Sequence, residues 1–193
     1  NQFKLVYKEG EIKKGRNLLA FEVAKRNILN FLKVEQESIK NGDAIKIIAL
    51  ETTFERSLNH PNLPFPVLIK GNVDRIEERN NVIRIIDYKT GKVEKPSLIL
   101  KSWNGLIDDI KYDKIIQILA YAFMYESHVN GKNMEAGIIS FKNLKSGFLP
   151  FNFKVDKEET LIINEQIMRD YTTQIVLLLN EILDENIPFE EKI

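Results

Sequence analysis

Two runs of residues decide the fold: Gly71-Asn72-Val73-Asp74-Arg75-Ile76-Glu77 and, shortly after, Ile85-Ile86-Asp87-Tyr88-Lys89-Thr90-Gly91-Lys92. The ranges 67–77 and 82–88 that contain them are rich in Val and Ile, which predicts two β-strands. Asn80 and Asn81 lie between the strands, and asparagine tolerates the positive φ of a two-residue hairpin turn. The sequence therefore predicts an antiparallel hairpin that turns at these asparagines.

The position of the turn also predicts the register of the hairpin. Residues equally distant from the turn face one another, so Asp74 should lie opposite Asp87. Glu77 should lie opposite Arg84, and this pair of opposite charges favours the same register. Lys89 follows Asp87 by two residues and so points to the same face of the strand. We expect two carboxylates and one ammonium on one face of the hairpin.

Two facing carboxylates repel each other, and one of them tends to stay protonated unless a cation lies between them. A divalent metal such as Mg²⁺ takes oxygen ligands and removes this conflict. A lysine beside the metal could then position a water for attack on phosphorus. The alternative is that Lys89 only neutralises the acids in a solvated ion-pair cluster, and the residues alone leave both interpretations open.

These motifs resemble the PD-(D/E)XK nuclease superfamily, and more closely the RecB/AddB-type exonuclease domain of bacterial double-strand-break repair proteins. The resemblance rests on Gly-x-x-Asp-Arg-Ile-Glu and on Ile-Asp-Tyr-Lys-Thr-Gly-Lys, and it covers about residues 44–141. The family also has a Gln-x-x-x-Tyr motif on a downstream helix, which Gln117 and Tyr121 match. The resemblance implies a restriction-endonuclease-like α/β fold, with a mixed central sheet flanked by helices.

The resemblance also implies a function, the hydrolysis of DNA phosphodiester bonds with Mg²⁺ or Mn²⁺. Asp74 and Asp87 would hold the metal, with the backbone carbonyl of Tyr88 as a third oxygen. Lys89 would orient the water or stabilise charge on the phosphate. Glu51, which ends an apolar run, matches a family glutamate and is a further candidate ligand of the metal or of its water. The residues expected to bind DNA are Gln117, Tyr121 and Lys92.

The family context suggests partners and also shows departures. DNA is the expected partner, with a helicase domain or subunit as a second candidate. Some relatives hold an iron–sulfur cluster through cysteines, but this chain has none, which excludes such a cluster and disulfides within these residues. The family often has a histidine on a helix before the first strand, and residues 17–40 contain none. The rival hypothesis is a catalytically inactive module with a nuclease-like fold, which binds DNA or a helicase without cutting.

Composition is consistent with an ordinary globular domain. The chain has 193 residues, enough for one core, and we expect a single nuclease-like domain over residues 1–193 that is a fragment of a longer chain. Its 28 basic and 28 acidic residues balance, which argues mildly against strong DNA binding by the isolated chain. No apolar run is long enough for a membrane span, and the lack of cysteine suggests a bacterial-type cytoplasmic setting.

Periodic apolar positions predict the remaining elements. Helices are expected over residues 17–40, 112–129 and 156–183, the last with Asp156 as its N-cap. Further strands are expected over residues 44–51, continuing to 55, and over 136–141 and 148–155, with a connector over 91–111. Residues 1–14 fit either a short strand or an arm.

Overall fold

The computed structural model describes residues 14–189 and divides the chain into two compact units, residues 1–43 and 44–193. The described element of the first unit is helix α2 (Gly15–Lys40), which confirms the predicted helix. Asn41 ends it, with its backbone N–H bonded to the carbonyl of Glu37. The expected strand or arm over residues 1–14 lies, except for Lys14, outside the described residues. The expectation of a single domain stays a prediction.

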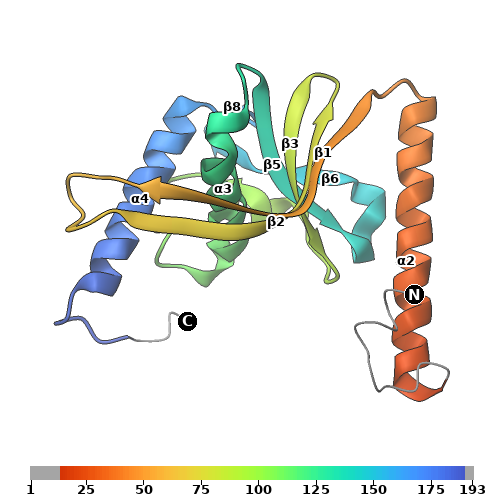
Figure 1. Ribbon diagram of the computed structural model, residues 1–193, viewed down its shortest axis with the longest axis horizontal. Helices are drawn as coiled ribbons and strands as arrows, with labels where there is room; N and C mark the ends of the chain where they lie inside the picture. The colour runs from red at the N-terminus through yellow and green to blue at the C-terminus, as the bar shows by residue number, and fades with distance from the viewer. Residues whose placement is uncertain (1–13, 190–193) are drawn as a thin grey trace. The chain divides into compact units, whose positions relative to one another are not determined.

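The second unit is built on a five-stranded sheet with the order β1-β2-β3-β5-β6 (Figure 1). The neighbouring pairs are antiparallel except β3 and β5, which run parallel, so the sheet is mixed and the expected α/β class is confirmed. The strands are β1 (Ile45–Leu58), β2 (Val67–Arg79), β3 (Val82–Lys89), β5 (Asn133–Ser140) and β6 (Phe148–Pro150).

The hairpin between β2 and β3 has the predicted turn and register. Asn80 and Asn81 have φ values of 51° and 67°, as a two-residue turn of this kind requires. Glu77 lies opposite Arg84, and Arg75 lies opposite Ile86. The ladder ends at this second pair, and beyond it the backbone N–H of Tyr88 donates to Oδ2 of Asp74.

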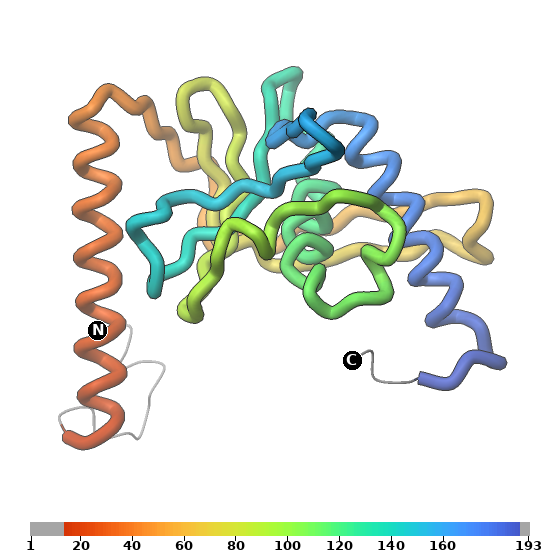
Figure 2. The backbone as a smooth tube through the Cα atoms, turned by 180° about the vertical axis from the view of Figure 1, so that it is seen from behind, coloured from red at the N-terminus to blue at the C-terminus, as the bar shows by residue number. Residues whose placement is uncertain are grey.

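Helix α3 (Asp113–Tyr125) packs against β1, β2, β3 and β5 and supplies much of the core. It begins close to the predicted position and ends earlier, because residues 126–128 form the 3-10 helix η3 (Glu126–His128). Helix α4 (Glu165–Leu183) packs on α3, where the Tyr171 hydroxyl donates to the carbonyl of Ile116 at 3.1 Å. Both views show α4 beyond α3, farther from β3 and β5 (Figures 1 and 2). Among the described residues, no helix is both long and apolar enough to span a membrane.

The connector before α3 contains more structure than the sequence predicts. It crosses in front of α3 in the view of Figure 2 and includes the 3-10 helices η1 (Lys95–Leu98) and η2 (Ile110–Tyr112). Its short strand β4 (Ile99–Leu100) pairs with β7 (Asn152–Val155), which also pairs with β8 (Glu158–Thr160). The 3-10 helix η4 (Phe141–Ser146) leads from β5 to β6.

Two predictions for the C-terminal part are wrong. The single strand expected over residues 148–155 is divided between two sheets, because β6 ends at Pro150, which has no N–H for a ladder, and β7 joins the small sheet. Asp156 is not an N-cap: its φ of 53° places it in the turn between β7 and β8. The cap of α4 is Asn164, whose side chain accepts from the backbone N–H of Ile167 at 3.0 Å. Aspartate favours both turns and caps, so local sequence did not distinguish them.

Candidate active site

The structure brings Asp74, Asp87 and Lys89 together at the middle of the large sheet. Asp74 lies on β2, and the other two lie on its neighbour β3. The backbone N–H of Tyr88 donates to Oδ2 of Asp74 at 2.7 Å, which fixes this carboxylate against the adjacent strand. Nζ of Lys89 lies 2.9 Å from Oδ2 of Asp87. The two carboxylates and the ammonium therefore form one cluster.

Asp87 is an unusual carboxylate because only 3% of the residue is exposed. Burial raises the pKa of Asp87, and the charge of Asp74 also raises it, whereas the nearby Lys89 ammonium lowers it. Its Oδ2 receives no well-oriented hydrogen bond from residues 14–189, although Lys89 is close in distance. A buried acceptor in this condition is stabilised by a bound cation.

The backbone near Asp74 departs from a regular strand. Val73 and Ile76 are both in the core, although residues three apart on a regular strand face opposite sides. On β1 the ladder shifts between Ile47 and Ala49, and Glu51 has a φ of 45° in the left-handed region. Bulges of this kind redirect side chains and are common next to active sites. The irregular segment of β1 lies alongside Asp74, because Leu50 pairs with Arg75.

Gln117 and Tyr121 also reach this cluster, from α3. Nζ of Lys89 donates to Oε1 of Gln117 at 2.8 Å, and Nε2 of Gln117 donates to the Tyr121 hydroxyl at 2.9 Å. Burial is the main cause that raises the pKa of Tyr121, and the charges of Asp87 and Asp74 contribute. The sequence predicted that these two residues share a helix face, but it gave no sign that Gln117 binds Lys89.

Glu51 and Lys92 are less closely associated with the cluster. Glu51 is exposed and accepts a hydrogen bond from Nδ2 of Asn72 at 3.1 Å. Lys92 is exposed and pairs with Glu94 at 2.5 Å. In the part of the chain that the structure describes, no three His, Cys, Asp or Glu side chains form a group that could hold a metal. The roles expected for Glu51 and Lys92 remain predictions.

Ser140 is a contributor that the sequence analysis missed. It ends β5 directly beside Lys89 in the parallel ladder, and only 1% of it is exposed. Its hydroxyl donates to the carbonyl of Gly91 at 2.7 Å and accepts from the backbone N–H of Val93 at 3.4 Å. Ser140 thus secures the loop that follows Lys89. Nothing in the sequence distinguished it from any other serine at the end of a strand.

A second charged cluster lies along β2 itself. Glu77 is fully buried and pairs with Arg75 and with Arg79, the latter at 2.8 Å. Arg84, which faces Glu77 in the register, pairs instead with Glu135 on β5 at 2.9 Å. The predicted cross-strand position is correct, but the ion pair expected between Glu77 and Arg84 is replaced by these contacts. The charges of this cluster are paired with one another along β2, apart from the Asp74, Asp87 and Lys89 cluster.

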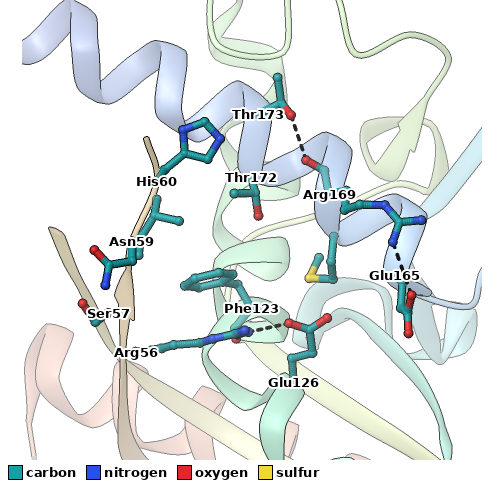
Figure 3. A pocket seen from close by; sticks show the side chains of 12 residues that line it. Arg56, Ser57, Asn59, His60, Phe123, Glu126, Glu165, Arg169, Thr172 and Thr173 are labelled. Atoms are coloured by element: carbon teal, nitrogen blue, oxygen red, sulfur yellow. Dashed lines mark hydrogen bonds and ion pairs between the residues drawn. The ribbon is translucent and has the colours of Figure 1, made fainter. Parts of the chain in front are cut away.

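A cavity of about 730 Å³ lies away from the carboxylates, between the end of β1, α3 and α4 (Figure 3). Arg56 crosses it to pair with Glu126 and lies over the ring of Phe123, 4.3 Å from its centroid. Arg169 and Thr172 line the opposite wall on α4. Asp74, Asp87 and Lys89 do not line this cavity, so it is not part of the carboxylate cluster.

Comparisons with known proteins identify the fold family. A family model described as the PD-(D/E)XK nuclease superfamily matches residues 7–192. A solved structure, described as the crystal structure of SSO0001, is similar at 17% sequence identity with a TM-score of 0.31, over 91% of this chain and 69% of that chain. None of the curated proteins matches the chain.

Proposed function

Because the chain belongs to the PD-(D/E)XK nuclease superfamily, we propose that it is a DNA nuclease whose active site is formed by Asp74, Asp87 and Lys89. The observation that carries this proposal is the buried Asp87, which faces a second carboxylate and lies 2.9 Å from the Lys89 ammonium. A solvated surface cluster would leave these acids exposed. The burial of Asp87 therefore favours a catalytic role for these residues over a solvated ion-pair cluster in which Lys89 only neutralises the acids.

Nucleases of this superfamily use divalent metals, and the residues present fit one. Asp87 has a buried carboxylate oxygen without a well-oriented donor. Within residues 14–189, the Tyr88 N–H binds one oxygen of Asp74, which leaves its other oxygen as a possible ligand. These carboxylates, with the Tyr88 carbonyl, would hold Mg²⁺ or Mn²⁺, and Mg²⁺ commonly keeps several waters beside one or two carboxylates. When bound, such a metal activates water and neutralises charge on the phosphate.

The protein's own groups supply orientation and charge. Asp87 and Asp74 are fixed on adjacent strands, so their separation is set by the sheet and not by flexible loops. The Lys89 ammonium lies on the same face, where it would stabilise negative charge developing on phosphate oxygens or orient the attacking water. Lysine as the proton acceptor would need a pKa far below its usual value of about 10.4, so we assign it the orienting role.

The finer parts of the proposal rest on the motif resemblance. The motifs of residues 71–92 and the Gln117 and Tyr121 pair support a RecB/AddB-type exonuclease that acts in DNA double-strand-break repair beside a helicase. Tyr121 and Lys92 are the proposed DNA contacts, and Glu51 is a proposed further ligand. Gln117, also expected at the DNA, has a different role in the inference below.

The test is digestion of linear single-stranded, linear double-stranded and closed circular DNA with Mg²⁺, Mn²⁺ or EDTA. An exonuclease of this kind should degrade at least one of the two linear DNAs, only when metal is present. It should leave the closed circular DNA intact. The Asp74→Asn protein keeps the shape of the side chain and should lose this degradation. If the protein cuts the circular DNA, the nuclease assignment stands but the exonuclease assignment is wrong.

The alternative, an inactive DNA-binding module, predicts a different result. Such a protein would bind DNA equally well with and without metal, and it would cut no substrate in any condition. Binding of labelled DNA measured by fluorescence anisotropy, in EDTA and in Mg²⁺, distinguishes the two functions. Metal-independent binding without cutting would overturn the proposed nuclease.

A further inference from the structure

Gln117 connects the candidate catalytic lysine to the helix that covers it. Nζ of Lys89 has two protein partners, Oδ2 of Asp87 at 2.9 Å and Oε1 of Gln117 at 2.8 Å. The bond to Gln117 uses one of the three N–H donors of the ammonium, whereas Asp87 attracts the ammonium as an ion-pair partner without a well-oriented hydrogen bond. These two contacts hold the ammonium between β3 and α3 and leave N–H donors for a substrate or water.

Restraint of this kind matters for a lysine in particular. Its ammonium is a compact charge at the end of a flexible four-carbon chain, which can place the charge in many positions. The Lys89 side chain is 30% exposed, so packing alone does not immobilise it. The contact with Gln117 ties the end of this side chain to α3.

The orientation of the Gln117 amide follows from the chemistry of its two partners. A lysine ammonium only donates hydrogen bonds, so the amide oxygen must face Lys89. The amide nitrogen then faces Tyr121 and donates to its hydroxyl oxygen at 2.9 Å. Both ends of the amide therefore have protein partners. The Tyr121 hydroxyl accepts this bond and keeps its own proton for another acceptor.

Tyr121 is in turn positioned by Gly71. A Cβ at residue 71 would lie 3.2 Å from Cε1 of Tyr121 and 3.1 Å from Cε of Met124. Contacts this close require the tyrosine ring or the methionine to shift, so glycine at 71 lets α3 approach β2. This gives a physical reason for the glycine that precedes Asp74 by three residues.

From these contacts we propose that Gln117 is a positioning residue, which acts by aiming the Lys89 ammonium and is held in place by Tyr121. This inference rests on the proposed nuclease function and reassigns Gln117 from a DNA contact. Loss of Gln117 lowers the rate of the cleavage step and leaves the affinity for DNA nearly unchanged. Tyr121 contributes to the rate of the cleavage step through Gln117, whereas its proposed contact with DNA would change the affinity for DNA.

The experiment compares Gln117→Leu, Gln117→Glu, Tyr121→Phe and the double variant Gln117→Leu/Tyr121→Phe. Single-turnover cleavage is measured in Mg²⁺, and DNA affinity is measured in EDTA. Gln117→Leu should slow cleavage roughly 10- to 100-fold, the loss expected for one hydrogen bond to a charged group. DNA affinity should change less than about twofold. Gln117→Glu should recover part of the rate, because a carboxylate also accepts from Lys89.

The double variant tests the connection through Tyr121. If Tyr121 acts through Gln117, the loss caused by Tyr121→Phe disappears in the Gln117→Leu background. Matched controls are Tyr125→Phe, one turn farther along α3, and Gln166→Leu on α4, whose amide bonds Asp170. Both controls should cleave at the rate of the unmodified protein.

Three outcomes would overturn the inference: weakened DNA binding in Gln117→Leu that accounts for its loss of activity, unchanged cleavage in that variant, or fully additive losses in the double variant. A second readout does not depend on activity. The Lys89 ammonium protons, observed by NMR with ¹⁵N-labelled lysine, should exchange with water faster in Gln117→Leu than in the unmodified protein. If the unmodified protein cuts no DNA, the proposed function fails, and equal exchange rates would then reject the positioning role independently.

Discussion

The carboxylate of Asp87 lies 2.9 Å from the ammonium of Lys89, and the two residues are separated by one position on β3. The aspartate is almost completely buried, whereas the lysine is partly exposed. The ion pair therefore compensates only part of the cost of burying the carboxylate, and burial still raises its pKa. Without a bound cation, the buried carboxylate should therefore lower the stability of the folded protein.

Asp87→Asn should stabilise the metal-free protein at neutral pH. A carboxyl whose pKa is raised by folding contributes favourably at low pH, and this contribution is lost as pH rises from its ordinary pKa of 3.8 toward the raised value. Asparagine does not titrate, so the variant avoids this loss. Thermal unfolding in EDTA should show a melting temperature above that of the unmodified protein at pH 7, by roughly 2–4 °C for each kcal/mol relieved. The difference should shrink below pH 4.

Added metal should reverse the order of the two melting temperatures. A metal that binds only the folded protein stabilises it by about 2.7 kcal/mol at one hundred times its dissociation constant. Mg²⁺ or Mn²⁺ should therefore raise the melting temperature of the unmodified protein and leave Asp87→Asn nearly unchanged. An equal rise in both proteins would show that the metal binds elsewhere.

Glu51→Gly should preserve or increase stability. Glu51 has a φ of 45°, and a residue with a side chain is destabilised by about 1–2 kcal/mol in the left-handed region. Glycine avoids this strain, but its greater conformational entropy in the unfolded chain offsets about half of the gain. The expected gain is up to about 1 kcal/mol by urea unfolding. Glu55→Gly, in the same strand, is the control and should be destabilised. If Glu51→Gly also loses the stabilisation by metal, Glu51 is a ligand; if it keeps all of it, that assignment is wrong.

Gly137→Ala should be strongly destabilising. A Cβ at this position of β5 would lie 2.2 Å from the carbonyl oxygen of Leu149, a backbone atom that cannot move without breaking the ladder to β6. The expected loss is at least about 1–3 kcal/mol, seen as a lower midpoint in urea. Gly91→Ala is the control, because a Cβ there meets nothing within 4 Å. Similar midpoints for the two variants would argue against the pairing of β5 with β6.

Glu77→Ala should cost about 3–5 kcal/mol, because it removes the shared partner of the buried Arg75 and the partly buried Arg79. Glu55→Ala is the matched control. Glu55 pairs with Lys70 at 3.5 Å, and both side chains are more than half exposed. Its loss should be below about 1 kcal/mol. Equal losses in the two variants would mean that Glu77 is not buried in a charge cluster.

The hairpin could be predicted from sequence because its information is local. Asn80 and Asn81 specify the turn, and the turn specifies the register, which the structure shows from Arg79 with Val82 to Arg75 with Ile86. Continued by one pair, this register predicts Asp74 opposite Asp87. The alternation of side chains then puts Lys89 on the same face. None of these steps requires knowledge of a distant segment.

The contacts that could not be predicted all involve a third element. Arg84 pairs with Glu135 because β5 lies beside β3, and the hairpin sequence does not reveal that neighbour. Gln117 binds Lys89 because α3 packs on the sheet with one particular rotation about its own axis. The apolar periodicity of the sequence predicts which broad face of the helix is buried, but it does not predict this exact rotation. Ser140 reaches Gly91 for the same kind of reason, through the parallel ladder of β3 and β5.

The most direct test of the central claim is single-turnover cleavage of end-labelled linear DNA by the unmodified protein and by Lys89→Ala, in Mg²⁺ and in Mn²⁺. The unmodified protein should cleave the DNA only with metal, and cleavage should slow by about 100-fold or more in the variant, as expected for loss of a group that stabilises charge in the transition state. Metal stabilisation and DNA affinity should both remain in the variant. Cleavage by Lys89→Ala at the rate of the unmodified protein would contradict the claim that Asp74, Asp87 and Lys89 form the active site.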